Sequence, residues 1–371
     1  GADLIGTERA GGEERPRRAG RTGAAAILAV WLLAGAASGA ETVAVPSTGD
    51  PISPASRPAR TTDPRLESLD WIIDSAVSRP PLRGADVAVL IGSLSSGETL
   101  YERSADRAMV PASNMKIVTG AAALHVLGPE FEFETAVATD EGPGGSVLEG
   151  NLYVRGSGDP SLVSEELWQL AEKIRVLGVE RIEGDLVLDA GYFDAAATAS
   201  SAVSEGDRAY HARTGALSLN FNAIAVHVTP GPSPGDPALV ELSPATSFVG
   251  LRNSAGTGRR GSSSSLRVRR TFEDGKNVVL VEGRIPEGSK TAVFYRSIDN
   301  GLGYFGSVFR GFLDSAGIEI AGDAVPGEVP NDATVLVRHR SKPLSLIVRD
   351  LNKFSNNFVA EQLVKAIGAA A

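Results

Sequence analysis

The sequence has no cysteine and only four histidines in 371 residues. The absence of cysteine excludes disulfide bonds, thiol nucleophiles and metal sites built on cysteine. No two histidines are spaced as a His-x-x-x-His pair, so a zinc hydrolase has no local support either. The four are His125, His211, His227 and His339.

The N-terminal region lacks an apolar run long enough to span a membrane. The run at 24–37 falls short of the ~20 residues that a spanning helix needs. Several arginines precede it, and the small residues Ser38-Gly39-Ala40 follow it. This order of basic, apolar and small residues is typical of a signal peptide. We expect residues 1–40 to direct export to the periplasm or another extracytoplasmic compartment, with an uncleaved anchor as the alternative.

An excess of basic charge is missing as well, because the formal net charge is -9. Both signs occur throughout the chain, so we expect no nucleic-acid partner. Residues 253–270 are locally rich in arginine and serine. We interpret this segment as a solvated loop, and a patch for an anionic polymer is the alternative.

The first part of the chain after residue 40 shows a linker and three predicted elements. Residues 41–65 are rich in Pro, Ser and Thr, which indicates a linker. Apolar spacing predicts a helix over 65–77 and a β-hairpin over 86–102. A further helix is predicted to begin near Ser113 and to end at Gly128-Pro129. Its predicted buried stripe consists of Ile117, Ala121, Leu124 and Leu127.

The rest of the chain changes texture twice. From about 130 to 335, short apolar runs alternate with Gly, Pro and Asp turns, which predicts a β-rich region with one clear helix near 165–177. After Pro343 the helical period returns in two stripes. They are Leu344, Ile347, Val348 and Leu351, and then Phe358, Val359, Leu363 and Ile367. The length favours two or more domains.

The strongest local signal for chemistry is the segment 111–116, Pro-Ala-Ser-Asn-Met-Lys. Lys116 is the only lysine with a serine three positions earlier. Because residues i and i+3 share one side of a helix, Lys116 can reach the Ser113 hydroxyl. A neutral Lys116 could take its proton if burial or neighbouring cations lowered the lysine pKa toward ~7–8. The alternative is a chance match, with Ser113 as a helix cap and Lys116 in solvent.

A second signal is Ser355-Asn356-Asn357, between the two helical stretches. A hydroxyl there could relay a proton to a leaving amine, and a side-chain amide could hold a substrate amide. Helix capping is the alternative.

Two further segments match such motifs only in part. Ser218-Leu219-Asn220 also fits Ser-x-Asn, but it lies in a predicted alternating strand with Ser218 and Asn220 on one face, and we interpret it as structural. No Lys-Thr-Gly or Lys-Ser-Gly occurs. The nearest match, Arg213-Thr214-Gly215, precedes Ser355, and we do not expect it to substitute.

Several segments together resemble one family. Residues 111–116 and 354–358 look like the first and second motifs of the peptidase S13 family, the class C low-molecular-mass penicillin-binding proteins. The long interval between the motifs is similar to that family, which houses inserted domains there, whereas class A β-lactamases have a far shorter one. The resemblance covers roughly residues 66–368. Further similar segments occur in the same order at 156–162, 182–189, 216–222 and 343–347.

The resemblance implies an α/β (α+β) fold. A penicillin-binding or serine β-lactamase-like transpeptidase domain would be split by a large β-rich insert. Its first part would be 66–135, the insert 136–335 with two subdomains, and its second part 336–371. The hairpin would supply two of five sheet strands. The remaining strands and the Lys-Thr-Gly motif would follow residue 371, so we expect the chain to be cut off at its C-terminal side.

The resemblance also implies a serine-type D-Ala-D-Ala carboxypeptidase or endopeptidase acting on peptidoglycan stem peptides. Ser113 would form the acyl-enzyme, with Lys116 as general base, Ser355 as proton relay and Asn357 as substrate-binding residue. β-Lactams would acylate Ser113. No metal or organic cofactor is needed, and a loose association with membrane or wall stays open.

The alternative function is a non-catalytic peptidoglycan-binding or scaffold protein that lacks the Lys-Thr-Gly motif. The DNA sequence beyond codon 371 would separate the two. A polypeptide that ends at residue 371 is expected not to react with a fluorescent penicillin, because one oxyanion-hole donor would be absent.

Overall fold

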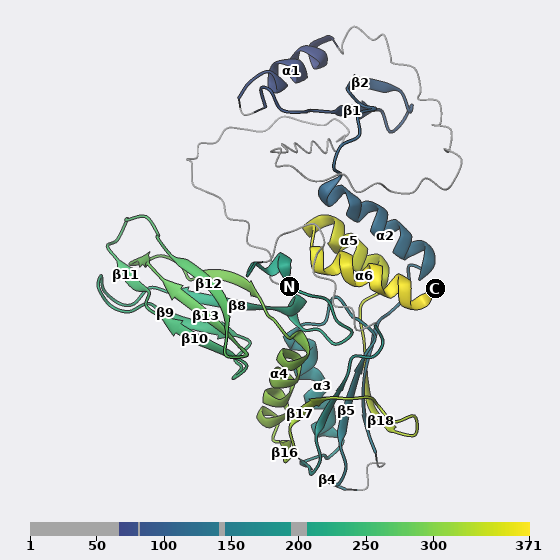
Figure 1. Ribbon diagram of the computed structural model, residues 1–371, viewed down its shortest axis with the longest axis vertical. Coiled ribbons are helices and arrows are strands. Elements are labelled where there is room, and N and C mark those ends of the chain that lie inside the picture. Colours follow the sequence, from purple (N-terminus) through teal and green to yellow (C-terminus); the bar gives the residue numbers. More distant parts are fainter. Residues whose placement is uncertain (1–66, 81, 141–144, 194–205) are drawn as a thin grey trace, which may run out of the picture. The chain divides into compact units, whose positions relative to one another are not determined.

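The computed structural model describes residues 67–80, 82–140, 145–193 and 206–371 (Figure 1). The predicted signal peptide (1–40) and linker (41–65) lie outside them. The described residues form two compact units, a smaller unit of residues 67–112 and a larger unit of residues 113–371. No helix among the described residues is both long and apolar enough to cross a membrane.

The smaller unit contains the predicted helix and hairpin. Helix α1 (Glu67–Val77) precedes the antiparallel strands β1 (Val89–Gly92) and β2 (Thr99–Arg103). The buried Tyr101 on β2 donates its hydroxyl to Asp74 on α1 at 2.7 Å. This hydrogen bond holds the hairpin against the helix, and both predicted elements are confirmed.

Three helices of the larger unit lie side by side: α2 (Met115–Val126), α5 (Leu344–Phe354) and α6 (Asn357–Ala370) (Figure 1). The predicted helices at these places are confirmed, although a single 3-10 turn, Ala112–Asn114, comes before α2. The helices share one apolar core. It includes Ala123, Ile347, Val348, Leu351, Val359 and Leu363.

The predicted buried stripe of α2 is wrong in part. Ile117 is 62% exposed, and the buried residues are Lys116, Gly120 and Ala123. A Cβ added at Gly120 would lie 2.9 Å from Cγ1 of Val348, so α5 approaches α2 closely along this face. Small residues permit that approach, and they turn Lys116 toward the helix bundle.

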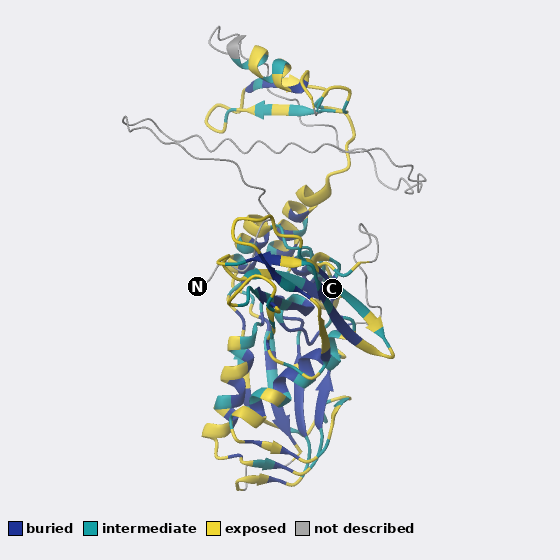
Figure 2. Cartoon of the chain, turned by 90° about the vertical axis from the view of Figure 1, so that its left-hand side faces the viewer, coloured by how far each residue is buried: buried dark blue, intermediate teal, exposed yellow. Residues whose placement is uncertain are grey.

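A five-stranded sheet forms a second layer of the larger unit, in the order β17-β7-β5-β3-β18. Strands β5, β7 and β17 are parallel, and β3 and β18 are antiparallel to their neighbours. The strand bounds are β3 (Glu134–Thr139), β5 (Leu152–Gly156), β7 (Leu186–Asp189), β17 (Ala324–Pro326) and β18 (Thr334–Arg340). The central strands β3, β5 and β7 are mostly buried, and the edge strands β17 and β18 are mostly exposed or half-buried (Figure 2). The predicted insert boundaries fall within β3 and β18, and the division into domains stays a prediction.

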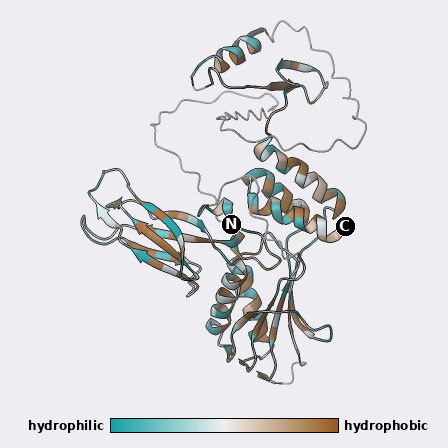
Figure 3. Ribbon diagram, in the orientation of Figure 1, coloured by the Kyte–Doolittle hydropathy of each residue, from teal (hydrophilic) through white to brown (hydrophobic). Residues whose placement is uncertain are grey.

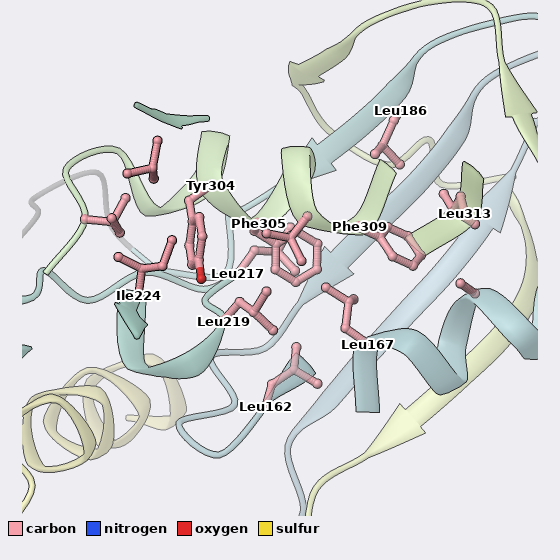
Figure 4. Packing of buried hydrophobic residues seen from close by; sticks show 14 of the residues in the cluster. Leu162, Leu167, Leu186, Leu217, Leu219, Ile224, Tyr304, Phe305, Phe309 and Leu313 are labelled. Atoms are coloured by element: carbon pink, nitrogen blue, oxygen red, sulfur yellow. The ribbon is translucent and has the colours of Figure 1, made fainter. Parts of the chain in front are cut away.

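Two helices, α3 (Ser164–Val176) and α4 (Gly301–Ser315), pack against each other and against this sheet. Only α3 was predicted, so the expectation of one helix in the β-rich region is wrong. Glycines at 301, 303, 306 and 311 obscured α4. Gly306 is required by packing, because a Cβ there would lie 2.6 Å from Leu188 Cδ1. Figure 4 shows the α4 side chains that meet α3 and the sheet, including Tyr304, Phe305, Phe309 and Leu313.

The other strands of the larger unit form four small sheets, which confirms the predicted β-rich texture. Hydrophobic residues are spread along these strands (Figure 3), and the buried ones continue the core that lies around α4. The orders are β15-β8-β9, β10-β13-β12, β11-β14 and β16-β6-β4. The bounds are β4 (Val147–Leu148), β6 (Arg181–Ile182), β8 (Ala223–Thr229), β9 (Leu239–Ser243), β10 (Val249–Asn253), β11 (Gly256–Gly258), β12 (Arg267–Glu273), β13 (Lys276–Glu282), β14 (Arg284–Pro286), β15 (Ala292–Ser297) and β16 (Glu319–Ile320).

Two local predictions are corrected here. The arginine-rich segment is a loop only in part, because Arg267–Glu273 forms β12, where Arg269 pairs with Glu282 at 3.4 Å. The segment around Ser218 is no alternating strand. Asn220–Asn222 forms a 3-10 turn with positive φ at all three residues, and β8 begins only at Ala223.

Candidate active site

Ser113 and Lys116 meet where the chain enters α2. Ser113 lies exposed in the 3-10 turn, and Ala112 before it has φ of 45°, a conformation that costs energy for alanine. Lys116 is in the first turn of α2, and its Nζ donates to Ser113 Oγ at 3.1 Å. Asn114, not Ser113, is the N-cap residue, and its side chain makes no cap hydrogen bond. The alternative interpretation had Ser113 as the helix cap and Lys116 in solvent. In the structure Ser113 is not the cap and Lys116 is buried.

Asn357 brings the second motif to the same lysine. Helix α5 ends with Ser355 in the left-handed conformation, and the Asn356 side chain then caps α6 by accepting from Val359 N at 3.3 Å. Asn357 is the first residue of α6, and its Oδ1 accepts a hydrogen bond from Lys116 Nζ at 2.7 Å. The capping role therefore belongs to Asn356, which leaves Asn357 to contact the site.

The buried position of Lys116 disfavours the charged form of its side chain. Lys116 is only 9% exposed, and burial lowers the pKa of its ammonium below the usual range. The carboxylate of Glu361, one turn along α6 from Asn357, raises the pKa and opposes this effect. Ser113 Oγ and Asn357 Oδ1, which accept hydrogen bonds from Nζ, are neutral oxygens. The lysine therefore loses its proton more readily than a solvated one.

Ser355 lies near these residues but not in direct contact with them. It is half-buried in the α5–α6 turn, and its backbone N–H donates to Leu351 O at 2.8 Å. In the part of the chain that the structure describes, its hydroxyl makes no direct hydrogen bond with Ser113 or Lys116. The fold thus joins three of the four predicted residues by hydrogen bonds and places the fourth on an adjacent turn.

A cavity of about 590 Å³ opens beside the same turn. Ser355, Asn356 and Asn357 form one part of its wall, and the β8–β15 sheet forms another. The start of α3, the segment 208–210 and the turn residues Asn220 and Phe221 also contribute to the wall.

Gln362 supports the site and was not predicted. It is fully buried, and its Nε2 donates to Gly158 O at 3.1 Å and to Gly215 O at 2.9 Å. Its Oε1 accepts from Gly215 N at 3.1 Å. The Arg213-Thr214-Gly215 segment is thus a backbone support for α6. A polar residue between the apolar Val359 and Leu363 was the sequence signal that could have indicated this role.

A serine at the start of a helix, a buried lysine one turn later and a Ser-x-Asn turn together define the penicillin-binding class of serine proteins. The sequence matches the family described as D-Ala-D-Ala carboxypeptidase 3 (S13) over residues 69–371. The chain belongs to this family, and the expected membership is confirmed.

Two curated relatives agree with the family assignment. The chain is 36% identical over 368 residues to a D-alanyl-D-alanine carboxypeptidase of Actinomadura sp. (strain R39), covering 95% of this chain and 65% of that protein. It is 24% identical over 285 residues to D-alanyl-D-alanine carboxypeptidase DacB of Haemophilus influenzae, covering 76% of this chain and 59% of that protein. The chain therefore spans less than two thirds of the length of either relative.

Solved structures show the same fold. A crystal structure of penicillin-binding protein 4 (dacB) from Haemophilus influenzae aligns with a TM-score of 0.65 and 22% identity, covering 81% of this chain and 65% of that one. A complex of that protein with a novel β-lactam aligns with a TM-score of 0.61 and 22% identity, covering 80% and 64%. The expected penicillin-binding fold with mixed helices and sheets is confirmed.

Proposed function

We propose that the protein is a serine-type D-Ala-D-Ala carboxypeptidase or endopeptidase that acts on peptidoglycan stem peptides through a Ser113 acyl-enzyme. The observation that carries the proposal is the position of Lys116 Nζ, 3.1 Å from Ser113 Oγ and 2.7 Å from Asn357 Oδ1. Membership of the S13 family and the names of the relatives support the substrate class.

Lys116 acts as the general base in this proposal. Once the amine is neutral, one of its N–H bonds donates to Asn357 Oδ1, and its lone pair can point to the Ser113 hydroxyl. Ser113 Oγ then attacks the carbonyl carbon of the penultimate D-Ala while its proton passes to Nζ. The new C–O bond gives a tetrahedral intermediate, and the start of α2 favours its negative charge.

The second motif completes the transfer. The C–N bond breaks when the leaving amine receives a proton, which the Ser355 hydroxyl relays from Lys116. Asn357 uses Oδ1 for Lys116, so its Nδ2 is left to donate to a carbonyl of the stem peptide. Water then attacks the acyl-enzyme and releases the shortened peptide and free Ser113.

β-Lactams would react with the same serine. Their strained amide stands in for the scissile peptide bond and leaves a stable ester on Ser113. The β-lactam complex of Haemophilus influenzae penicillin-binding protein 4 supports this part of the proposal. The substrate also implies action outside the cytoplasm, in keeping with the predicted signal peptide.

The test uses the product of the native gene. It compares the wild-type protein with the variants Ser113→Ala and Ser95→Ala. Ser95 is an exposed serine of the β1–β2 turn and serves as the matched control. We expect wild type and Ser95→Ala to bind a fluorescent penicillin and to release D-Ala from a pentapeptide, and Ser113→Ala to do neither. Labelling that survives in Ser113→Ala would refute the nucleophile. Peptidoglycan binding by a wild-type protein that is neither labelled nor active would favour the scaffold.

A further inference from the structure

The cavity beside the Ser355–Asn357 turn extends away from the reacting groups. Its volume is about 590 Å³, and neither Ser113 nor Lys116 lines it. Asn357 belongs to both places, because it accepts from Lys116 and also lines the cavity. A ligand in the cavity can therefore be continuous with a peptide at Ser113.

The outer face of the β8–β15 sheet forms the floor of the cavity. Side chains alternate along a strand, and on β8 the core takes Ile224 and Val226 while Ala225 and His227 face outward. Ala225 pairs with Tyr295 of β15. Because the Ala225 side chain is small, it leaves space above the floor, and the aromatic ring of Tyr295 lies beside this space.

This floor gives an extended peptide little to bind. Strand β8 is paired on one side with β15 and on the other with β9, so its backbone N–H and C=O groups are already used. Peptides that bind to sheets usually add a strand at a free edge. A ligand that lies over β8 therefore has to be recognised by side chains.

The side chains suit a neutral ligand whose rings have apolar faces. Aromatic residues line the cavity at Tyr210, Phe221, Tyr295 and Phe354, whereas Phe294 pairs with Val226 and packs against the core. Charges of both signs occur: Glu165 and Arg208 line the wall, and Arg296 is already occupied by Asp207 at 3.3 Å. Hydroxyl and amide groups of Ser164, Asn220 and Ser243 are interspersed. N-acetylated sugar rings, with apolar faces and a polar rim, match this mixture better than a charged chain does.

We infer that the cavity binds a short segment of β-1,4-linked N-acetylated amino sugars, the glycan to which a stem peptide is attached. The inference rests on the proposed function for its choice of glycan. A stem peptide of a few residues spans about 3.3–3.6 Å per residue, which is enough to reach from Ser113 past Asn357 into the neighbouring cavity. The enzyme would then hold sugar and peptide at once and would prefer glycan-attached substrates.

The experiment measures binding of triacetylchitotriose, a peptide-free trimer of such sugars, to the full chain by saturation-transfer NMR and titration. Tyr295→Leu removes a ring, Tyr295→Phe keeps it, and Ala225→Trp fills the floor. Phe272→Ala is the control, because Phe272 is 52% exposed and does not line the cavity. We expect binding to weaken about tenfold in Tyr295→Leu and Ala225→Trp, which corresponds to ~1.4 kcal/mol, and to change little in the other two.

Failure of this inference can be told apart from failure of the proposed function. The same titration on Ser113→Ala should give wild-type sugar affinity, whether or not Ser113 is the nucleophile. Cavity variants should keep wild-type labelling by a fluorescent penicillin, which carries no sugar, and should raise KM for glycan-attached substrates more than for free stem peptides. The inference is overturned if the trimer does not bind, if the variants bind it equally, or if only a sugar-free stem peptide shows cavity-dependent binding.

Discussion

Lys116 and Asn357 are 241 positions apart in the sequence, yet Nζ of the lysine donates to Oδ1 of the asparagine across 2.7 Å. Between them the chain forms the sheets of the larger unit and the helix pair α3–α4, and it returns through α5. The contact ties the first motif to the second and fixes one hydrogen of the lysine. The orientation of the lysine lone pair toward Ser113 therefore depends on Asn357, a residue that is distant from Lys116 in the sequence.

Replacing Asn357 should slow acylation. Asn357→Ala removes the acceptor for Lys116, and the loss of one hydrogen bond to a charged or buried amine predicts a decrease of about 10- to 100-fold in the acylation rate. The measurement is the second-order rate constant with a fluorescent penicillin, on protein expressed from its own gene. Asn352→Ala, on the exposed side of α5, is the control. An unchanged rate in Asn357→Ala would show that the contact has no part in the reaction.

The pH dependence of acylation should respond to Glu361. Its carboxylate raises the pKa of Lys116, so Glu361→Gln should lower that pKa. More of the lysine is then neutral at a given pH, and the acid limb of the acylation profile should move to lower pH. An acid limb that moves to higher pH in Glu361→Gln would contradict this prediction, because it would mean that Glu361 does not stabilise the ammonium form of Lys116.

The control for this experiment is Glu149→Gln, because Glu149 is exposed on the segment between β4 and β5. It changes the net charge by the same amount. A shift that appears in both variants would be a general charge effect, and only a shift confined to Glu361→Gln supports a local interaction with Lys116.

Periodic patterns predicted the elements whose apolar residues all face one core. The stripe Leu344, Ile347, Val348 and Leu351 is buried throughout and α5 is where it was expected. Helix α4 was missed because its glycines reduce helix propensity, while Gly306 is needed for the close approach of Leu188. Packing in the folded protein outweighed local preference there.

The candidate site was predicted as residue types but not as an environment. Spacing alone placed Lys116 near Ser113, and the Ser355-Asn356-Asn357 motif, together with the resemblance, pointed to Ser355 and Asn357. Sequence reasoning put Ile117 on the buried face of α2, whereas the fold buries Lys116. That choice depends on the small residue Gly120 facing Val348 from α5, a contact between distant segments that no local pattern contains.

Gln362 should be important for stability although it does not touch Ser113 or Lys116. Gln362→Leu leaves Gly158 O and Gly215 N without their buried partner, whereas Gly215 O keeps the hydrogen bond from the Ser218 hydroxyl at 2.9 Å. Unsatisfied buried groups cost about 1–3 kcal/mol each, and partial relaxation predicts a total loss of roughly 2–4 kcal/mol in the free energy of unfolding. Chemical denaturation measures it, with the exposed Gln169→Leu on α3 as the control. Equal stability of the two variants would contradict the bridging role.

Lys116 should cost stability while it supports catalysis. Lys116→Met removes a buried ammonium and keeps a side chain of similar length, so it should raise the free energy of unfolding by about 0.5–2 kcal/mol at neutral pH. Loss of the general base should reduce acylation by ~10²–10⁴. Activity and stability thus change in opposite directions.

The sign of the pH dependence follows from the lowered pKa of Lys116. Between its folded pKa and its ordinary value of 10.5, the unfolded chain binds the extra proton, so the wild type gains stability as pH rises through that window. Lys116→Met has no such proton. The advantage of the variant should be largest near pH 7 and should shrink toward pH 10, and denaturation of both proteins at the two values measures it. An advantage that stays constant or grows with pH would show that burial does not disfavour the charged lysine.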